Sequence, residues 1–128
     1  LTPPASGSDR DDGYLSASEI AALKFDAEWV LLSACNTAAG GADGGEALSG
    51  GAGAFFYAGA RSLLVSHWYV ESDATVALVA GTFAEMKERP HNGRAEAMRR
   101  SMVELIDEGL PPGRWAPFVI VGEGGAVR

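Results

Sequence analysis

The sequence predicts an α/β fold with a mostly parallel sheet of about three strands, and two observations support this. Three continuous apolar runs, at residues 28–35, 60–68 and 115–122, lack the alternation of a half-exposed strand. Such runs are typical of strands covered on both faces. The segments between them carry apolar residues at helical spacing. Strands that alternate with helices favour parallel crossovers and a layered sandwich with helices on both faces.

Four helices are expected around these strands. The first covers residues 14–24, where Ser16 and Glu19 have the spacing of a capping box. Ile20 and Leu23 of this helix are expected to face inward. The other three helices are predicted at residues 45–59, 73–89 and 94–108.

The two longest helices each have one apolar face that we expect to be buried. Ser72 is expected to cap the helix at residues 73–89. The inward face of that helix is predicted to contain Val76, Val79, Ala80, Phe83 and Met86. The inward face of the last helix is predicted to contain Ala95, Met98, Met102, Leu105 and Ile106.

Composition excludes several classes of function. The net charge of −7 and the pI near 4.7 leave no basic patch for nucleic acid. The apolar runs are shorter than the roughly 18 residues that a membrane span requires, so no membrane partner is expected. A single cysteine cannot form an internal disulfide, and we therefore expect a reducing, cytoplasmic location.

Cys35 is the leading candidate for chemistry. It ends the first apolar run and precedes a glycine-rich loop at residues 36–45, which is where an open α/β sheet places its ligands. A nucleophilic cysteine needs a general base, usually histidine, and the chain offers only His67 and His91. His67 follows the second strand and is a secondary candidate for this base; the alternative is a histidine packed beside Trp68 with one nitrogen hydrogen-bonded.

Four acidic residues also follow the predicted strand ends, and they allow two interpretations. They could line a pocket for a basic side chain through charge-assisted hydrogen bonds. Alternatively, they could be acids at helix N-termini that complement the helix dipole. The four are Asp43, Glu46, Glu71 and Asp73.

No motif in the sequence indicates that the chain binds a nucleotide or a metal ion. The glycine-rich loop lacks the Gly-Lys-Ser/Thr ending of a phosphate-binding loop and the spacing of a dinucleotide fingerprint. One cysteine and two separated histidines give no zinc signature. We expect no cofactor and no metal.

Several segments together resemble a known family. They are residues 32–38, 45–50, 54–62, 66–68, 73–75 and 115–119. In this order and spacing they resemble the CHAT domain, a caspase-like module often found downstream of tetratricopeptide repeats in bacterial proteins. The resemblance implies a caspase-like three-layer sandwich and a cysteine peptidase that cleaves a peptide or protein substrate.

The resemblance also implies roles for particular residues. Cys35 matches the family's nucleophile, and the loop that begins with Asn36 and Thr37 would shape the substrate cleft. The family's catalytic histidine normally precedes a glycine at the end of the strand before the cysteine strand. The chain has no His-Gly pair. We therefore expect residues 1–128 to be the C-terminal portion of a single CHAT domain, with the histidine upstream and this portion alone inactive.

The strand that leads to Cys35 is expected to form an open edge of the sheet. An open apolar edge tends to pair with another strand, so the expected partners are another chain or the upstream part of the same protein, including its repeat domains. Two other functions remain open. One is a non-catalytic interaction or regulatory module with the same fold, and the other is a flavodoxin-like domain that binds a small molecule.

Overall fold

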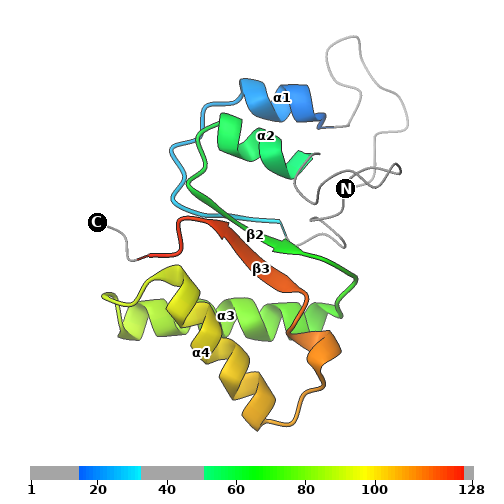
Figure 1. Cartoon of the computed structure of the whole chain (residues 1–128), viewed down its shortest axis with the longest axis vertical. Coiled ribbons are helices and arrows are strands. Elements are labelled where there is room, and N and C mark those ends of the chain that lie inside the picture. The colour runs from blue at the N-terminus through cyan, green and yellow to red at the C-terminus, as the bar shows by residue number, and fades with distance from the viewer. Residues whose placement is uncertain (1–14, 33–50, 126–128) are drawn as a thin grey trace.

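The structure, a computed structural model, describes residues 15–32 and 51–125. These residues form an α/β arrangement of helices and a three-stranded sheet (Figure 1). In chain order the elements are α1 (Ala17–Ala22), β1 (Val30–Leu31), α2 (Gly51–Tyr57), β2 (Ser62–Ser66), α3 (Ser72–Glu88), α4 (Arg94–Asp107), the 3₁₀ turn η1 (Pro112–Arg114) and β3 (Phe118–Gly122). The predicted α/β class and the three strands are confirmed.

The sheet is mixed, with strand order β1-β2-β3. β1 pairs parallel with β2, with Val30 opposite Leu63. β3 pairs antiparallel with β2, with Phe118 opposite Ser66. The predicted parallel crossover is therefore observed between β1 and β2, whereas β3 runs antiparallel to β2.

The antiparallel pairing follows from the two helices between β2 and β3. α3 leads away from the end of β2, and α4 packs beside it and returns. The start of α4 lies beside the far end of β3, where the Ala95 N–H bonds the Gly124 carbonyl at 3.0 Å. A single helix between two strands would return the chain to the edge where β2 begins, and the next strand would run parallel to β2. The pair of helices α3 and α4 instead returns the chain to the edge where β2 ends, so β3 runs antiparallel to it.

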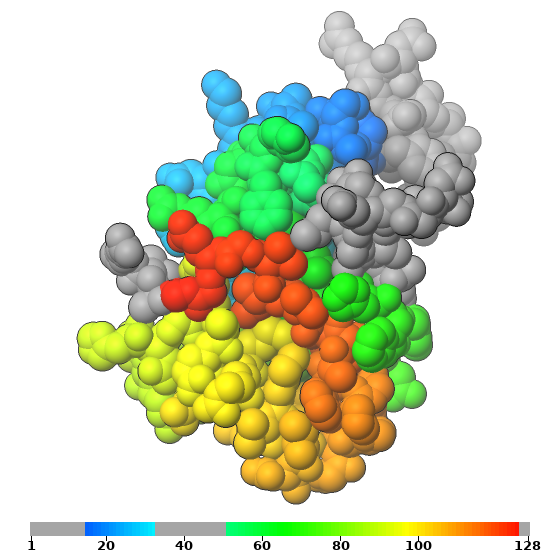
Figure 2. All heavy atoms as spheres, in the orientation of Figure 1, coloured from blue at the N-terminus to red at the C-terminus, as the bar shows by residue number. Residues whose placement is uncertain are grey.

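Helices cover both faces of the sheet, as predicted. Figure 1 shows α1 and α2 on one side of the strands and α3 and α4 on the other. Side chains of β2 alternate between the layers: Leu63 and Val65 belong to the core under α2, and Leu64 belongs to the core under α3 and α4. In the space-filling view, β3 runs between the α2 layer and the α4 layer (Figure 2).

The start of α1 agrees with the sequence. Ser16 is the N-cap, its hydroxyl accepts the Glu19 N–H at 3.3 Å, and the Glu19 carboxylate accepts the Ser16 N–H at 2.7 Å. This is the expected capping box. Ile20 is buried as predicted, but Leu23 is 44% exposed because it follows the end of the helix and caps its last turn.

The buried face of α3 differs from the predicted one. Its buried residues are Ala74, Leu78, Thr82 and Glu85. Val76 is 65% exposed and Phe83 is 47% exposed, although both belong to the predicted inward face. The reason is close packing against α4, which requires small residues: a side chain at Gly81 would collide with the Ser101 hydroxyl. α3 also begins one residue early, with Glu71 as its N-cap in place of the predicted Ser72.

α4 is fixed to the end of the sheet by a buried arginine. The side chain of Arg94 is 2% exposed and donates to the Glu123 carbonyl at 3.1 Å. Met98 and Leu105 are buried as predicted. Ile106, in contrast, is 44% exposed. The buried face of α4 includes Ala97 and Ser101, and this face is rotated about the helix axis away from Ile106. Among the described helices, none is both long and apolar enough to span a membrane.

Candidate functional site

The candidate site lies at the edge of the sheet where the parallel strands β1 and β2 end. The Leu32 N–H, just past β1, donates to the Leu64 carbonyl of β2 at 2.9 Å. β1 therefore delivers the chain to the same edge as the end of β2, and this edge is where α/β sheets bind their ligands. Five predicted site residues follow β1 but lie outside the described residues: Cys35, Asn36, Thr37, Asp43 and Glu46.

His67 lies at this edge and is exposed. It directly follows β2, and its backbone N–H donates to the Pro117 carbonyl at 3.0 Å. Within the described ranges, no hydrogen bond of its imidazole ring is formed, so the alternative of a ring fixed by a hydrogen bond is not observed there. The neighbouring Trp68 instead donates its indole N–H to the Gly113 carbonyl at 3.4 Å.

Glu71 and Asp73 converge on Arg114, which belongs to the turn before β3. One guanidinium nitrogen of Arg114, Nη2, lies 3.3 Å from a Glu71 carboxylate oxygen and donates to the Asp73 carboxylate. The side chains of Glu71 and Asp73 are 65% and 71% exposed, whereas that of Arg114 is 31% exposed. The structure thus brings together two of the four predicted acids and pairs both with a cation of this chain.

This pairing sets the electrostatics of the edge. The hydrogen bond from Arg114 lowers the pKa of Asp73, and the backbone N–H of Ala74, at 2.8 Å from the carboxylate, adds to the effect. The same pairing raises the pKa of Arg114. Asp73 also lies in the first turn of α3, where an acid complements the helix dipole. The position of Asp73 thus agrees with the helix-dipole interpretation, and the pocket for a basic substrate side chain stays a prediction.

Arg114 is a site residue that the sequence analysis missed. It lies 41 residues from Asp73 in the chain, and no periodic pattern connects the two. A lone arginine in the Pro-Pro-Gly-Arg turn that precedes a strand was the only available signal.

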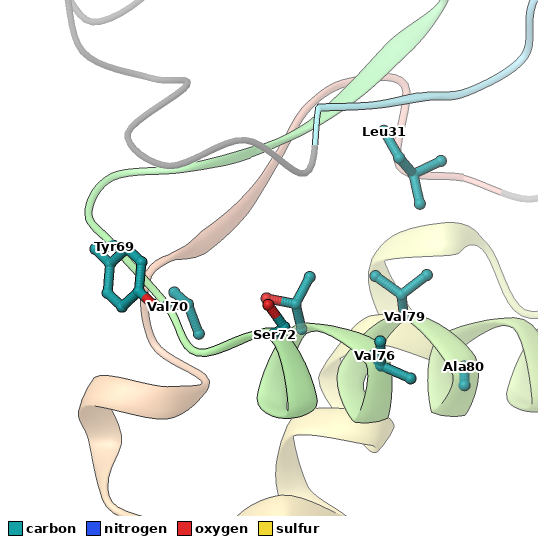
Figure 3. Close-up of a pocket in the computed structure, with 8 residues that line it drawn as sticks. Leu31, Tyr69, Val70, Ser72, Val76, Val79 and Ala80 are labelled. Atoms are coloured by element: carbon teal, nitrogen blue, oxygen red, sulfur yellow. The ribbon is translucent and has the colours of Figure 1, made fainter. Parts of the chain in front are cut away.

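An apolar hollow lies beside this edge, between β1 and the first half of α3. Its volume is about 510 Å³, and its walls include Leu31, Tyr69, Val70, Val76 and Val79. Figure 3 shows Leu31 facing α3 across the hollow, with Tyr69 and Val70 closing one end. This volume falls within the roughly 300–1,000 Å³ of pockets that bind small ligands.

The sequence model of the CHAT domain matches residues 4–123. The chain belongs to the CHAT domain family. A comparison with curated proteins and a comparison with solved structures each gave no match. The resemblance to the CHAT family is therefore confirmed over residues 4–123 of this chain.

The described part of this CHAT domain offers recognition groups rather than a complete set of catalytic groups. It supplies an exposed imidazole, a carboxylate pair neutralised in part by Arg114, and an apolar hollow. No three His, Cys, Asp or Glu side chains within residues 15–32 and 51–125 group as metal ligands would.

Proposed function

We propose that this CHAT domain carries the nucleophile and part of the substrate cleft of a caspase-like cysteine peptidase. The observation that carries the proposal is the family match over residues 4–123, which includes Cys35. The structure supports it because β1 runs toward the ligand-binding edge of the sheet.

In the proposed reaction, the Cys35 thiolate attacks the carbonyl carbon of a peptide bond. Backbone N–H groups, including that of Cys35, stabilise the negatively charged oxygen of the tetrahedral intermediate. The amine leaves after it takes a proton from a histidine that lies upstream of this chain, and a thioester remains. Water then cleaves the thioester, which releases the acid and regenerates the thiol. The reaction needs no cofactor, and it needs a reducing compartment such as the cytoplasm to keep Cys35 unoxidised.

The remaining predicted residues receive roles in substrate binding. We assign the cleft to the loop of Asn36, Thr37, Asp43 and Glu46 and to the turn that carries Glu71 and Asp73. A basic substrate side chain would have to share Glu71 and Asp73 with Arg114. The exposed imidazole of His67 stays a secondary candidate for the base, because it is at the same edge and makes no hydrogen bond with other described residues. The upstream repeat domains are the proposed regulatory partner.

The test uses the full-length protein and a peptidyl vinyl sulfone, which reacts irreversibly with activated thiols. We expect one adduct, on Cys35, together with hydrolysis of an unfolded protein substrate. Cys35→Ala should abolish both, while His91→Ala, at an exposed histidine outside the proposed cleft, should leave both unchanged. Hydrolysis that persists in Cys35→Ala would refute the assignment. A fully folded protein with neither adduct nor hydrolysis would favour the non-catalytic interaction module.

A further inference from the structure

Arg114 is the half-buried member of the ion-pair cluster at the edge where β2 ends. Its side chain is 31% exposed, whereas those of Glu71 and Asp73 are 65% and 71% exposed. Its Nη2 atom lies 3.3 Å from Oε2 of Glu71 and also donates to Oδ2 of Asp73. One cation of this chain therefore serves both acids of the turn that follows β2.

The contacts of the individual oxygen atoms show how little of this acidic pair is left for a substrate. Asp73 uses both carboxylate oxygens, because Oδ1 accepts the Ala74 N–H at 2.8 Å and Oδ2 accepts Arg114. Glu71 uses Oε2, and only its Oε1 has no such contact with the described residues. A guanidinium binds a carboxylate most firmly through two parallel hydrogen bonds. Neither acid offers two oxygens for that geometry.

The turn that carries Arg114 is itself held in place. The 3₁₀ turn η1 begins at a proline, whose ring restricts the backbone. The Arg114 N–H donates to the Pro111 carbonyl at 3.0 Å, within the turn. The Trp68 indole N–H donates to the Gly113 carbonyl at 3.4 Å and ties the turn to the segment between β2 and α3. These contacts keep the Arg114 guanidinium beside the two acids.

This arrangement disfavours a basic substrate side chain at the turn of Glu71 and Asp73. A charged side chain that enters a cleft loses its water and must be paired there. A substrate cation at this turn would meet the like charge of Arg114 and acids that already have a partner. An uncharged side chain needs no such partner, so it enters without that cost.

We propose that Arg114 is a specificity-determining residue of the cleft, because it pairs with Glu71 and Asp73 and removes their selectivity for basic side chains. The substrate class is then a polypeptide with an uncharged residue where it passes this turn. This inference rests on the proposed function, in which the turn of Glu71 and Asp73 lines the substrate cleft.

The test maps the bonds that the full-length protein cleaves in an unfolded protein substrate, by mass spectrometry of the products. For the wild type we expect no enrichment of arginine or lysine at any position beside the cleaved bonds, relative to their frequency in the substrate. In Arg114→Gln the two carboxylates lose their internal partner, so one position should become enriched in arginine and lysine. Arg99→Gln, which removes an ion pair on α4, is the matched control and should cleave the same bonds as the wild type.

Pairs of synthetic peptides measure the change in specificity. They are built on the sequence that the wild type cleaves fastest, and each pair differs only in arginine or citrulline at one position beside the cleaved bond. Citrulline has nearly the shape of arginine without its charge. The arginine-to-citrulline ratio of kcat/KM should stay within about threefold of one in the wild type. At one position it should rise about tenfold or more in Arg114→Gln.

Two further variants distinguish specificity from a structural role. Arg114→Lys keeps the charge and should keep the wild-type ratio, whereas a merely structural defect lowers both rates together and leaves the ratio unchanged. Should Arg114→Gln fail to fold by circular dichroism, Asp73→Asn decides. We expect a wild-type ratio in Asp73→Asn, because Arg114 and not the substrate uses this carboxylate. A fall of about tenfold in that ratio would overturn the proposal.

Other results would also overturn the proposed role of Arg114. They are enrichment of basic residues beside the bonds that the wild type cleaves, and an unchanged ratio in a folded Arg114→Gln protein. A failure of the proposed function is a different result, because the wild type would then neither cleave the unfolded protein nor react with the vinyl sulfone at Cys35. The role of Arg114 in specificity would fall with it.

Discussion

Arg114 reaches from the turn before β3 to the carboxylate of Asp73 at the start of α3. This ion pair, with Glu71 as a second partner, connects two turns at the edge of the sheet where β2 ends. The turn of Glu71 and Asp73 also carries His67 and one wall of the apolar hollow. Arg114 therefore positions candidate site residues that lie more than 40 residues earlier in the chain.

Substitution of Arg114 by glutamine should raise the pKa of Asp73 toward its usual value. The shift should be incomplete, because the Ala74 N–H still donates to the carboxylate. Nuclear magnetic resonance titration of the Asp73 carboxyl carbon measures this directly. Arg99→Gln, which removes an ion pair on α4, is the control and should leave the Asp73 titration unchanged. An unaltered Asp73 titration in Arg114→Gln would contradict the described pairing.

The burial of α3 predicts opposite effects for two of its residues. Leu78 is fully buried, so Leu78→Ala should lower the free energy of unfolding by about 2–5 kcal/mol. Val76 is 65% exposed, so Val76→Ala should change it by less than about 0.5 kcal/mol. Urea denaturation measures both. Equal losses for the two variants would show that α3 is rotated from the described orientation.

The contact between α3 and α4 predicts a steric coupling between Gly81 and Ser101. Gly81→Ala should destabilise the protein by about 1–3 kcal/mol, because the new methyl group collides with the Ser101 hydroxyl. Ser101→Ala removes that hydroxyl but also its hydrogen bond to the Leu78 carbonyl at 3.0 Å. A double-mutant cycle should show that Gly81→Ala costs less in the Ser101→Ala background. Additive losses would argue against the close packing.

The ion pairs of Glu96 predict a pH dependence of stability. Arg99 and Arg100 donate hydrogen bonds to the Glu96 carboxylate at 2.7 and 2.8 Å. These bonds, that of Arg99 first, lower the pKa of Glu96 from 4.5 to about 2. A carboxyl group with a depressed pKa in the folded state stabilises the fold above its unfolded pKa. That contribution is lost as the pH falls from about 4.5 through about 2.

Glu96→Gln should therefore flatten the dependence of the urea midpoint on pH in this acidic window. Glu108→Gln, which removes an exposed carboxylate at the end of α4, is the matched control and should retain the wild-type profile. A wild-type profile in Glu96→Gln as well would show that the pairing with Arg99 and Arg100 does not persist in solution.

Local patterns in the sequence were sufficient to predict the elements of the fold. The spacing of Ser16 and Glu19 predicted the start of α1, and the apolar run around Leu63 predicted a strand buried on both faces. Both features depend on residues close together in the chain. The direction of β3 could not be predicted from local patterns. It depends on whether α3 and α4 pack side by side in opposite directions, and that contact joins residues far apart in the chain.

The buried face of α3 was mispredicted for a similar reason. The most apolar face contains Val76 and Phe83, but α4 selects the face with Gly81, where Ser101 can approach closely. Periodicity measures how apolar a face is and not which neighbour covers it. Arg114 was missed because its pairing with Asp73 joins two distant turns. The predicted roles of Cys35 and of the loop after it lie outside the described residues and stay predictions.

The activation of Cys35 is the claim on which the proposed function depends, and the pH dependence of its alkylation tests it most directly. The measurement is made on the full-length protein with iodoacetamide, and the adduct is quantified by mass spectrometry. We predict an apparent thiol pKa well below the unperturbed value of about 8.5, which returns toward that value when an upstream histidine is replaced. An apparent pKa at or above about 8.5, unchanged by substitution of every upstream histidine, would contradict an activated dyad.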